Sequence, residues 1–303
     1  MKAEDKQPLF LVGATGTGKS AAGMELARRC GGAILAMDAM QVYRGADIGT
    51  SKASAAERAE IPHGGLDLVD FGATFDVAQY LKHAADFLRE QREAGRRVII
   101  VGGTGLYFRA LTRGLCEAPQ GSEALRAELA ALPVEALRER LRKVDPGMLA
   151  RVDVANPRRL ARAIEVMETS GKSLRAWQEE TPEPLVKEYR AYWICREKGE
   201  LARRIEARVE AMFAQGWVEE VRGLIARCGL EAVRGFAGIG YREIADWEVG
   251  GHRPPLQGLQ SDILVATRQY AKRQLTWFAR EPNLQKVMLS GSQPFPADEF
   301  LLP

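Results

Sequence analysis

The sequence of 303 residues has few cysteines, and the four that it contains, Cys30, Cys116, Cys195 and Cys228, lie far apart without a CxxC pair. This spacing excludes a disulfide-stapled fold and the usual ligand spacing of a zinc site. No stretch approaches 18 consecutive apolar residues, so no membrane-spanning helix is expected. Lysine and arginine number 43 against 40 acidic residues, and this near balance gives no argument of its own for nucleic acid as a partner.

The N-terminal segment also lacks the apolar stretch of a secretory signal, because its short hydrophobic run ends in glycines. We therefore expect a cytoplasmic protein with reduced thiols and no membrane association. The remaining composition, 46% apolar and 27% charged, is typical of a globular chain long enough for about two domains.

Short apolar runs at 8–12, 33–37 and 98–101 alternate with helical patterns at 19–30 and 77–93. Such alternation predicts a parallel sheet that is covered by helices on both faces. Further strands are expected at 189–195 and 285–289, and one long amphipathic helix at 200–228.

The amino-acid composition changes between 119 and 187, where Ala, Leu, Arg and Glu dominate and prolines recur. This pattern predicts several short helices. We therefore expect an α/β fold: a P-loop NTPase-like core with a mostly parallel sheet, formed by 1–118 and 188–303, and a helical insertion domain, 119–187.

The strongest single motif follows the first predicted strand and opens the first predicted helix. It matches G-x4-G-K-[ST] and consists of Gly13, Ala14, Thr15, Gly16, Thr17, Gly18, Lys19 and Ser20. Small residues let the backbone N–H groups of 14–20 curl around a phosphate, Lys19 adds a positive charge, and the Ser20 hydroxyl can bind Mg²⁺. We expect this loop to bind phosphate, with nucleoside triphosphates as the default ligands.

An NTPase of this type usually has a strand that ends in an aspartate, whereas the strand at 98–101 ends in Gly102-Gly103-Thr104. The missing acid argues against an ATPase but leaves a small-molecule kinase open.

Four further strings accompany the loop: MDAMQVYRGADIGTSK (37–52), VGGTGLYFRAL (101–111), GIGYRE (238–243) and TRQYAKRQLTWF (267–278). Together with Asp145-Pro146, NPRRLARAIEV (156–166) and RIEAR (204–208), the chain resembles the tRNA dimethylallyltransferases (tRNA isopentenyltransferases) almost from end to end. The Cys/His set of the eukaryotic members' zinc finger is absent, so the resemblance is to the bacterial type.

The resemblance implies transfer of a dimethylallyl group from dimethylallyl diphosphate to N6 of adenine 37, next to the anticodon of tRNA, with release of pyrophosphate. Asp38 matches the family's general base, and Thr104 matches a residue near the reacting adenine. Lys19 and Arg208 would stabilise the leaving pyrophosphate together with Mg²⁺ at Ser20. The implied partners are dimethylallyl diphosphate and the anticodon stem-loop of tRNA, and the protein is expected to be a monomer.

The adenine must leave its stack to reach the site, and the predicted tRNA-facing residues lie in four places. They are Asp38, Ala39, Met40, Gln41 and Thr104 in the core; Arg126 in the insertion; Arg158, Arg159, Leu160, Ala161 and Arg162 in the insertion; and Ala237, Gly238, Ile239, Gly240, Tyr241 and Arg242 in the core. In 267–280, Tyr270 and Trp277 stand seven residues apart, a spacing that predicts burial in the core rather than base stacking.

One departure from the family pattern concerns Ala36 and Ala39, which stand where the family commonly has serine, so two hydroxyl donors beside Asp38 are missing. Three alternatives remain open: a small-molecule kinase, an adenylate isopentenyltransferase that acts on free AMP or ADP, and a non-catalytic RNA-binding module. The basic stretch at 158–162 argues against a free nucleotide as acceptor, because a mononucleotide needs no such arm.

Overall fold

The computed structural model describes residues 7–251, 253–291 and 295–301; the ends of the predicted core segments, 1–6 and 302–303, lie outside the described residues. The chain divides into two compact units. The sheet unit comprises Met1–Phe108 and Val186–Pro303, and the helical unit comprises Arg109–Leu185, whereas the sequence predicted an insertion over 119–187.

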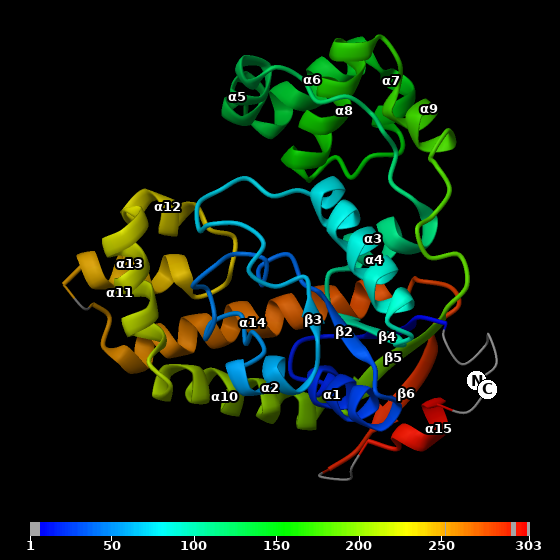
Figure 1. The fold of residues 1–303 in the computed structure, drawn as a ribbon. Helices are drawn as coiled ribbons and strands as arrows, with labels where there is room; N and C mark the ends of the chain where they lie inside the picture. The colour runs from blue at the N-terminus through cyan, green and yellow to red at the C-terminus, as the bar shows by residue number, and fades with distance from the viewer. Residues whose placement is uncertain (1–6, 252, 292–294, 302–303) are drawn as a thin grey trace. The chain divides into compact units, whose positions relative to one another are not determined.

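The sheet unit contains a six-stranded sheet in the order β3-β2-β4-β1-β5-β6 (Figure 1). Every strand pair in it is parallel, which confirms the predicted α/β fold class. The strands are β1 (Leu9–Val12), β2 (Ala33–Met37), β3 (His63–Gly64), β4 (Val98–Gly102), β5 (Arg190–Arg196) and β6 (Gln285–Leu289).

The apolar strands are buried on both faces, as their unbroken hydrophobic runs predict. Side chains alternate along β1, so Leu9 and Leu11 join the core under α1, while Phe10 packs edge-on against Phe108 on the opposite face. Because α1 and its cap follow β1 directly, the phosphate motif is placed at the carboxyl end of the sheet, where parallel α/β sheets bind ligands.

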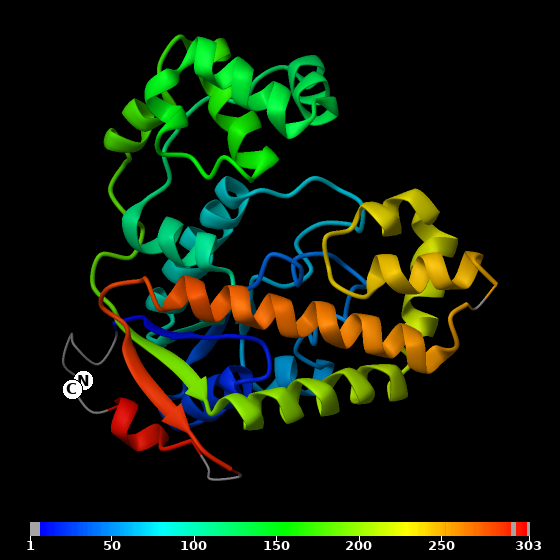
Figure 2. The ribbon, with the colours of Figure 1, turned by 180° about the vertical axis from the view of Figure 1, so that it is seen from behind.

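Helices of the sheet unit surround this sheet and extend beyond it. They are α1 (Lys19–Cys30), α2 (Ala55–Glu60), α3 (Val77–Glu93), α10 (Lys198–Ala214), α11 (Trp217–Cys228), α12 (Leu230–Gly235), α13 (Tyr241–Val249), α14 (Leu256–Phe278) and α15 (Ala297–Leu301). Helix α4 (Gly105–Arg113) begins in the sheet unit and ends in the helical unit. Helices α10 and α14 run side by side (Figure 2).

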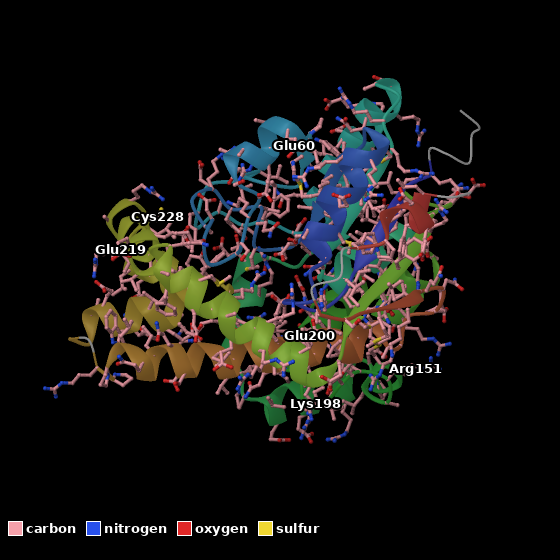
Figure 3. All side chains as sticks on the ribbon, turned by 90° about the horizontal axis from the view of Figure 1, so that it is seen from below. Glu60, Arg151, Lys198, Glu200, Glu219 and Cys228 are labelled. Carbon is pink, nitrogen blue, oxygen red and sulfur yellow. The ribbon has the colours of Figure 1, made fainter. Side chains whose placement is uncertain are left out.

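The single helix predicted over 200–228 is wrong, because the chain forms α10 and α11 instead. Gly216 separates them with a left-handed φ of 95°, a conformation that L side chains rarely adopt. Figure 3 labels Lys198 and Glu200 on α10, and Glu219 and Cys228 on α11. The break lets Trp217 turn into a second core with Val221 and Tyr241.

The helical unit has its own apolar core, in which Leu137, Leu141 and Ile164 are buried. Its helices are α5 (Glu123–Ala131), α6 (Val134–Val144), α7 (Pro146–Leu149), α8 (Pro157–Ser170) and α9 (Leu174–Glu179). In neither unit does a described helix combine the length and the apolar character needed to cross a bilayer. All four cysteines are free thiols.

Candidate active site

The phosphate motif forms an open cradle between β1 and α1. Gly16 and Gly18 take left-handed φ values of 83° and 93°, which let the backbone curl at two points that L side chains would strain. Gly18 also caps α1 without a side-chain hydrogen bond. The first N–H groups of α1 therefore remain available to an anion, and the positive end of the helix dipole points at it.

Two backbone donors of the predicted cradle are committed elsewhere. The Thr15 N–H donates to Oε1 of Gln274 at 2.9 Å, and the Thr17 N–H points to the Ala14 carbonyl at 3.4 Å. Of the N–H groups of 14–20 that were expected to face the phosphate, these two are used within the protein, and those of Gly16 and of Gly18, Lys19 and Ser20 are left for an anion.

Two cations meet at this cradle without a carboxylate partner. Lys19 and Arg208 line two adjoining cavities together with Ser20, and neither forms an ion pair within the described residues. Burial, reinforced by the nearby guanidinium of Arg208, lowers the pKa of Lys19 to about 8. Burial also lowers the pKa of Arg208, although Asp38 opposes this shift. An anion bound here would relieve the repulsion between the two groups.

Two more arginines support the outer side of the cradle. Arg204 Nε donates to the Gly16 carbonyl at 2.9 Å, and Arg196 Nε donates to the Thr17 carbonyl at 2.8 Å. Arg196 also pairs with Glu200, whereas Arg204 lines the smaller cavity of about 350 Å³ beside Lys19 and Arg208. The sequence motif RIEAR thus brings a second guanidinium to the phosphate loop, one helical turn before the predicted one.

Asp38 and Thr104 lie at the ends of two neighbouring strands, β2 and β4. Asp38 Oδ1 accepts the Met40 N–H at 2.8 Å, which fixes the carboxylate in an Asx turn. Thr104 Oγ1 accepts the Ala39 N–H at 3.2 Å, and so the glycine-flanked loop after β4 is tied to the loop that carries Asp38. Position 39 carries alanine where the family commonly has serine, but its backbone N–H still has a hydrogen-bond partner in Thr104.

These groups share one cavity of about 360 Å³. Its polar side includes Lys19, Ser20, Asp38, Thr104 and Arg208. Its apolar side is formed by Val101, Val209, Met212 and Trp217. The volume suits a small organic ligand. Lys19, Arg208 and Asp38 face this space beside the apolar wall, and a third cation, Arg273, also lines it.

Sequence reasoning missed several residues of this cavity, most of them on α10, α11 or α14, together with the loop residues 49–51 and Val101 and Gly102 of β4. Tyr270, expected in the core, lines the cavity instead, with the Arg273 guanidinium 5.7 Å from its ring centre. Gln274, Met212 and Trp217 also line it. The i, i+7 spacing of Tyr270 and Trp277 in 267–278 predicted that these side chains are buried. It could not show that Tyr270 faces an internal cavity.

The predicted tRNA-facing stretch at 237–242 divides into cavity and core residues. Ala237, Gly238 and Ile239 line the cavity, and Arg242 is exposed and 3.7 Å from Asp246. Tyr241 is fully buried and donates its hydroxyl to Glu220 at 2.7 Å, and Gly240 is buried against Trp217. The prediction that Gly240 and Tyr241 contact RNA directly is therefore wrong, because both residues are buried against other parts of the protein.

The basic candidates of the helical unit also divide. Arg126, Arg158 and Arg159 are exposed. Leu160 is buried in the core of the unit, which corrects its prediction as an RNA contact, while Ala161 is partly buried. Arg162 donates to the carbonyls of Ala118 and Pro119 and pairs with Glu165, so its guanidinium holds the unit's entry segment instead of facing a phosphate.

The donor set around Ser20 fits a magnesium ion that arrives with a diphosphate. Ser20 is exposed at the first turn of α1 and lines the same cavity as Asp38. No group of three or more acidic, His or Cys side chains among the described residues could hold a metal alone. Mg²⁺ is commonly held by one or two protein oxygens together with substrate phosphates and water.

The chain is similar to proteins of known families. The sequence model of the IPP transferase family matches residues 41–281, and that of isopentenyl transferase matches residues 8–69. A tRNA dimethylallyltransferase of Methylacidiphilum infernorum is 44% identical over 290 residues, 96% of this chain and 88% of the relative. One from Geobacter metallireducens is 43% identical and covers 96% of both chains. The crystal structure of a tRNA isopentenylpyrophosphate transferase from Bacillus halodurans has a TM-score of 0.67 at 32% identity, over 93% of this chain and 90% of that one.

Proposed function

The chain belongs to the IPP transferase family, and from this premise we propose that it is a tRNA dimethylallyltransferase. It transfers the dimethylallyl group of dimethylallyl diphosphate to N6 of adenine 37, next to the anticodon, and releases pyrophosphate. The observation that carries this proposal is the single cavity in which Lys19 and Arg208, two cations without a carboxylate partner among the described residues, face the same space as Asp38.

In the proposed reaction the cradle binds the leaving group, which is pyrophosphate. The allylic C–O bond breaks with its electron pair going to the diphosphate oxygen, and the delocalised allyl cation makes this possible if the new negative charge is stabilised. Lys19, Arg208 and the first N–H groups of α1 offer positive charge at fixed positions in a partly dry site, where electrostatic stabilisation is strongest. Mg²⁺ bound with the diphosphate at Ser20 would supply further charge neutralisation.

The acceptor amine is a weak nucleophile, so it must lose a proton as the new N–C bond forms. Asp38 suits this role, because the Met40 N–H binds only one of its two carboxylate oxygens. The hydroxyl oxygen of Thr104 accepts the N–H of Ala39, the residue after Asp38. The O–H proton of Thr104 remains available to the adenine. The apolar wall of Val101, Val209 and Met212 suits the five-carbon chain.

We propose that exposed basic residues hold the tRNA by its phosphates. Arg126 and Arg158 in the helical unit, and Lys272 and Arg273 on α14, are exposed, and single-stranded anticodon loops present bases that can be taken out of the stack. The enzyme acts as a monomer in the cytoplasm, where its tRNA substrate is found.

Mass spectrometry of digested tRNA tests the proposal. The protein is incubated with Mg²⁺, dimethylallyl diphosphate and an unmodified tRNA transcript, and dimethylallyl-adenosine is expected in the digest. A transcript with guanine at position 37 is the matched control and should stay unmodified. Product on AMP but not on tRNA would support an adenylate isopentenyltransferase, and label moved from γ-labelled ATP would support a kinase. Transcript binding without product would support an RNA-binding module.

A further inference from the structure

Gln274 on α14 is a buried amide that connects two loops of the site. Its side chain is only 6% exposed and lines the cavity of about 360 Å³. Oε1 accepts the N–H of Thr15 at 2.9 Å, and Nε2 donates to the carbonyl of Gly103 at 2.9 Å. Both ends of one amide are thus used by backbone groups that lie far apart in the sequence.

Each of these partners belongs to one half of the proposed reaction. Thr15 is the third residue of the phosphate cradle, and Gly103 immediately precedes Thr104, whose hydroxyl oxygen accepts the N–H of Ala39 beside Asp38. The contact is close: a Cβ on Gly103 would lie 2.1 Å from Nε2 of Gln274. Hydrogen bonds, joined by the covalent link between Gly103 and Thr104, therefore connect the cradle through Gln274 to the loop of the carboxylate.

We propose that Gln274 is a positioning residue that sets the distance between the diphosphate cradle and the carboxylate loop. The inference rests on the proposed function, because it assigns the leaving group to one loop and the acceptor to the other. Gln274 leaves the chemistry to other groups and acts through Thr15 and Gly103. Displacement of reacting groups by about 1 Å can cost about 100-fold in rate, so a bridge between the two loops has direct kinetic consequences.

The chemistry of the two contacts requires an amide. One atom must accept from an N–H while its neighbour donates to a carbonyl, and a glutamine side chain does both at once. A methionine of similar length can do neither, which leaves a buried N–H and a buried C=O without partners. An ionised glutamate accepts from Thr15 but presents a second acceptor to the Gly103 carbonyl, whereas a protonated glutamate restores the donor.

The test compares Gln274→Met and Gln274→Glu with wild type, and uses Gln257→Glu as the control. Gln257 is exposed at the start of the same helix and lies outside the catalytic and binding machinery. At pH 8 we expect both Gln274 variants to lower kcat for transfer about 10- to 100-fold, with a smaller change in KM for dimethylallyl diphosphate, since Lys19 and Arg208 remain. The control should match wild type.

The pH profile separates positioning from simple packing. Lowering the pH from 8 to 6 should narrow the ratio of wild-type kcat to Gln274→Glu kcat several-fold, because burial favours the protonated carboxyl, which donates to Gly103. The ratio for Gln274→Met should stay constant. Other charged groups that line the cavity, Lys19, Asp38, Arg208 and Arg273, are present in all variants. The uncharged Gln274→Met variant shows how their own titration contributes, and the difference between the two ratios isolates the effect of the new carboxyl.

A readout without turnover keeps this inference separable from the proposed function. Hydrogen exchange should become faster in both loops, 13–18 and 103–104, in Gln274→Met, while β1 and β4 remain protected. Unchanged exchange in both loops, or wild-type kcat in Gln274→Met, would overturn the positioning role. If the wild-type protein transfers nothing to tRNA but both loops loosen together in the variant, the proposed function fails while the connection between the loops stands.

Discussion

Raising the pH from 7 to 9 should weaken diphosphate binding through Lys19. The ammonium is partly buried, its Nζ donates only to the Ala14 carbonyl at 3.4 Å, and burial next to Arg208 lowers its pKa from 10.5 to about 8. The difference between these two values corresponds to about 3 kcal/mol of lost preference for the charged form. The unliganded cradle therefore loses its lysine charge in a pH range where an exposed lysine would keep it.

The size of the effect follows from linkage between proton and ligand binding. If only the charged lysine binds the anion, the apparent Kd rises by a factor of about 1.1 at pH 7 and about 11 at pH 9 relative to low pH. The affinity that Lys19 contributes should therefore fall about tenfold over this interval. Deprotonation removes the charge as the pH passes through 8, so the sign of the change is a loss of affinity.

Calorimetric titration with inorganic pyrophosphate and Mg²⁺ measures this directly in wild type and Lys19→Met. The ionisation of pyrophosphate affects both proteins equally, so the ratio of the Kd of Lys19→Met to that of wild type isolates the lysine. This ratio should shrink about tenfold from pH 7 to pH 9. Lys198→Met, which removes an exposed charge at the start of α10 (Figure 3), should give a ratio near one at every pH. A constant ratio for Lys19→Met would refute the argument that burial and Arg208 discharge the unliganded lysine.

Three further substitutions test the carboxylate, the RNA contact and the loop support. Asp38→Asn keeps an acceptor for the Met40 N–H but cannot take a proton, so the single-turnover rate should fall about 10²- to 10⁴-fold with tRNA affinity unchanged; an unaltered rate would remove Asp38 from the mechanism. Arg158→Ala should weaken tRNA binding and reduce the salt slope of log K by about one, and equal binding at several salt concentrations would show that this exposed arginine contacts no phosphate. Glu220→Ala removes the acceptor of the N–H groups of 47–49 and of the Tyr241 hydroxyl, so urea unfolding should show a loss of about 2–4 kcal/mol; a loss below 0.5 kcal/mol would mean that water replaces the carboxylate without penalty.

The sequence predicted those parts of the site that follow strands. Gly13–Ser20, Asp38 and Thr104 each come directly after a buried apolar run, and parallel strands bring their carboxyl ends to one edge. The strand and helix positions of the core were predicted for the same reason, because local periodicity and tertiary burial agree there. The break between α10 and α11 was missed since the amphipathic pattern continues across Gly216, and only its left-handed backbone ends the helix.

Residues on α10 and α14 were harder to predict because their role depends on partners about 170 to 260 positions away. Gln274 contacts Thr15 and Gly103, and no local pattern shows that a glutamine on a buried helix face will meet two backbone groups. Tyr270 has the spacing of a core residue and is indeed largely removed from water, but the space beside it is a cavity. Periodicity reports burial, and it does not report whether the buried neighbour is protein or ligand.

The charges of the cavity explain why the protein holds Asp38 away from the two cations. Arg208 lies close enough to Asp38 to feel its charge, yet the carboxylate is bound to the Met40 N–H instead. A direct ion pair would stabilise the unliganded protein, but it would neutralise both the group proposed to stabilise pyrophosphate and the group proposed to accept the proton. Keeping the charges apart costs folding free energy, which is expected at a functional site. In the proposed reaction, binding of a diphosphate would offset that cost, because it would supply the counter-charge for Lys19 and Arg208 and leave Asp38 free to act as the base.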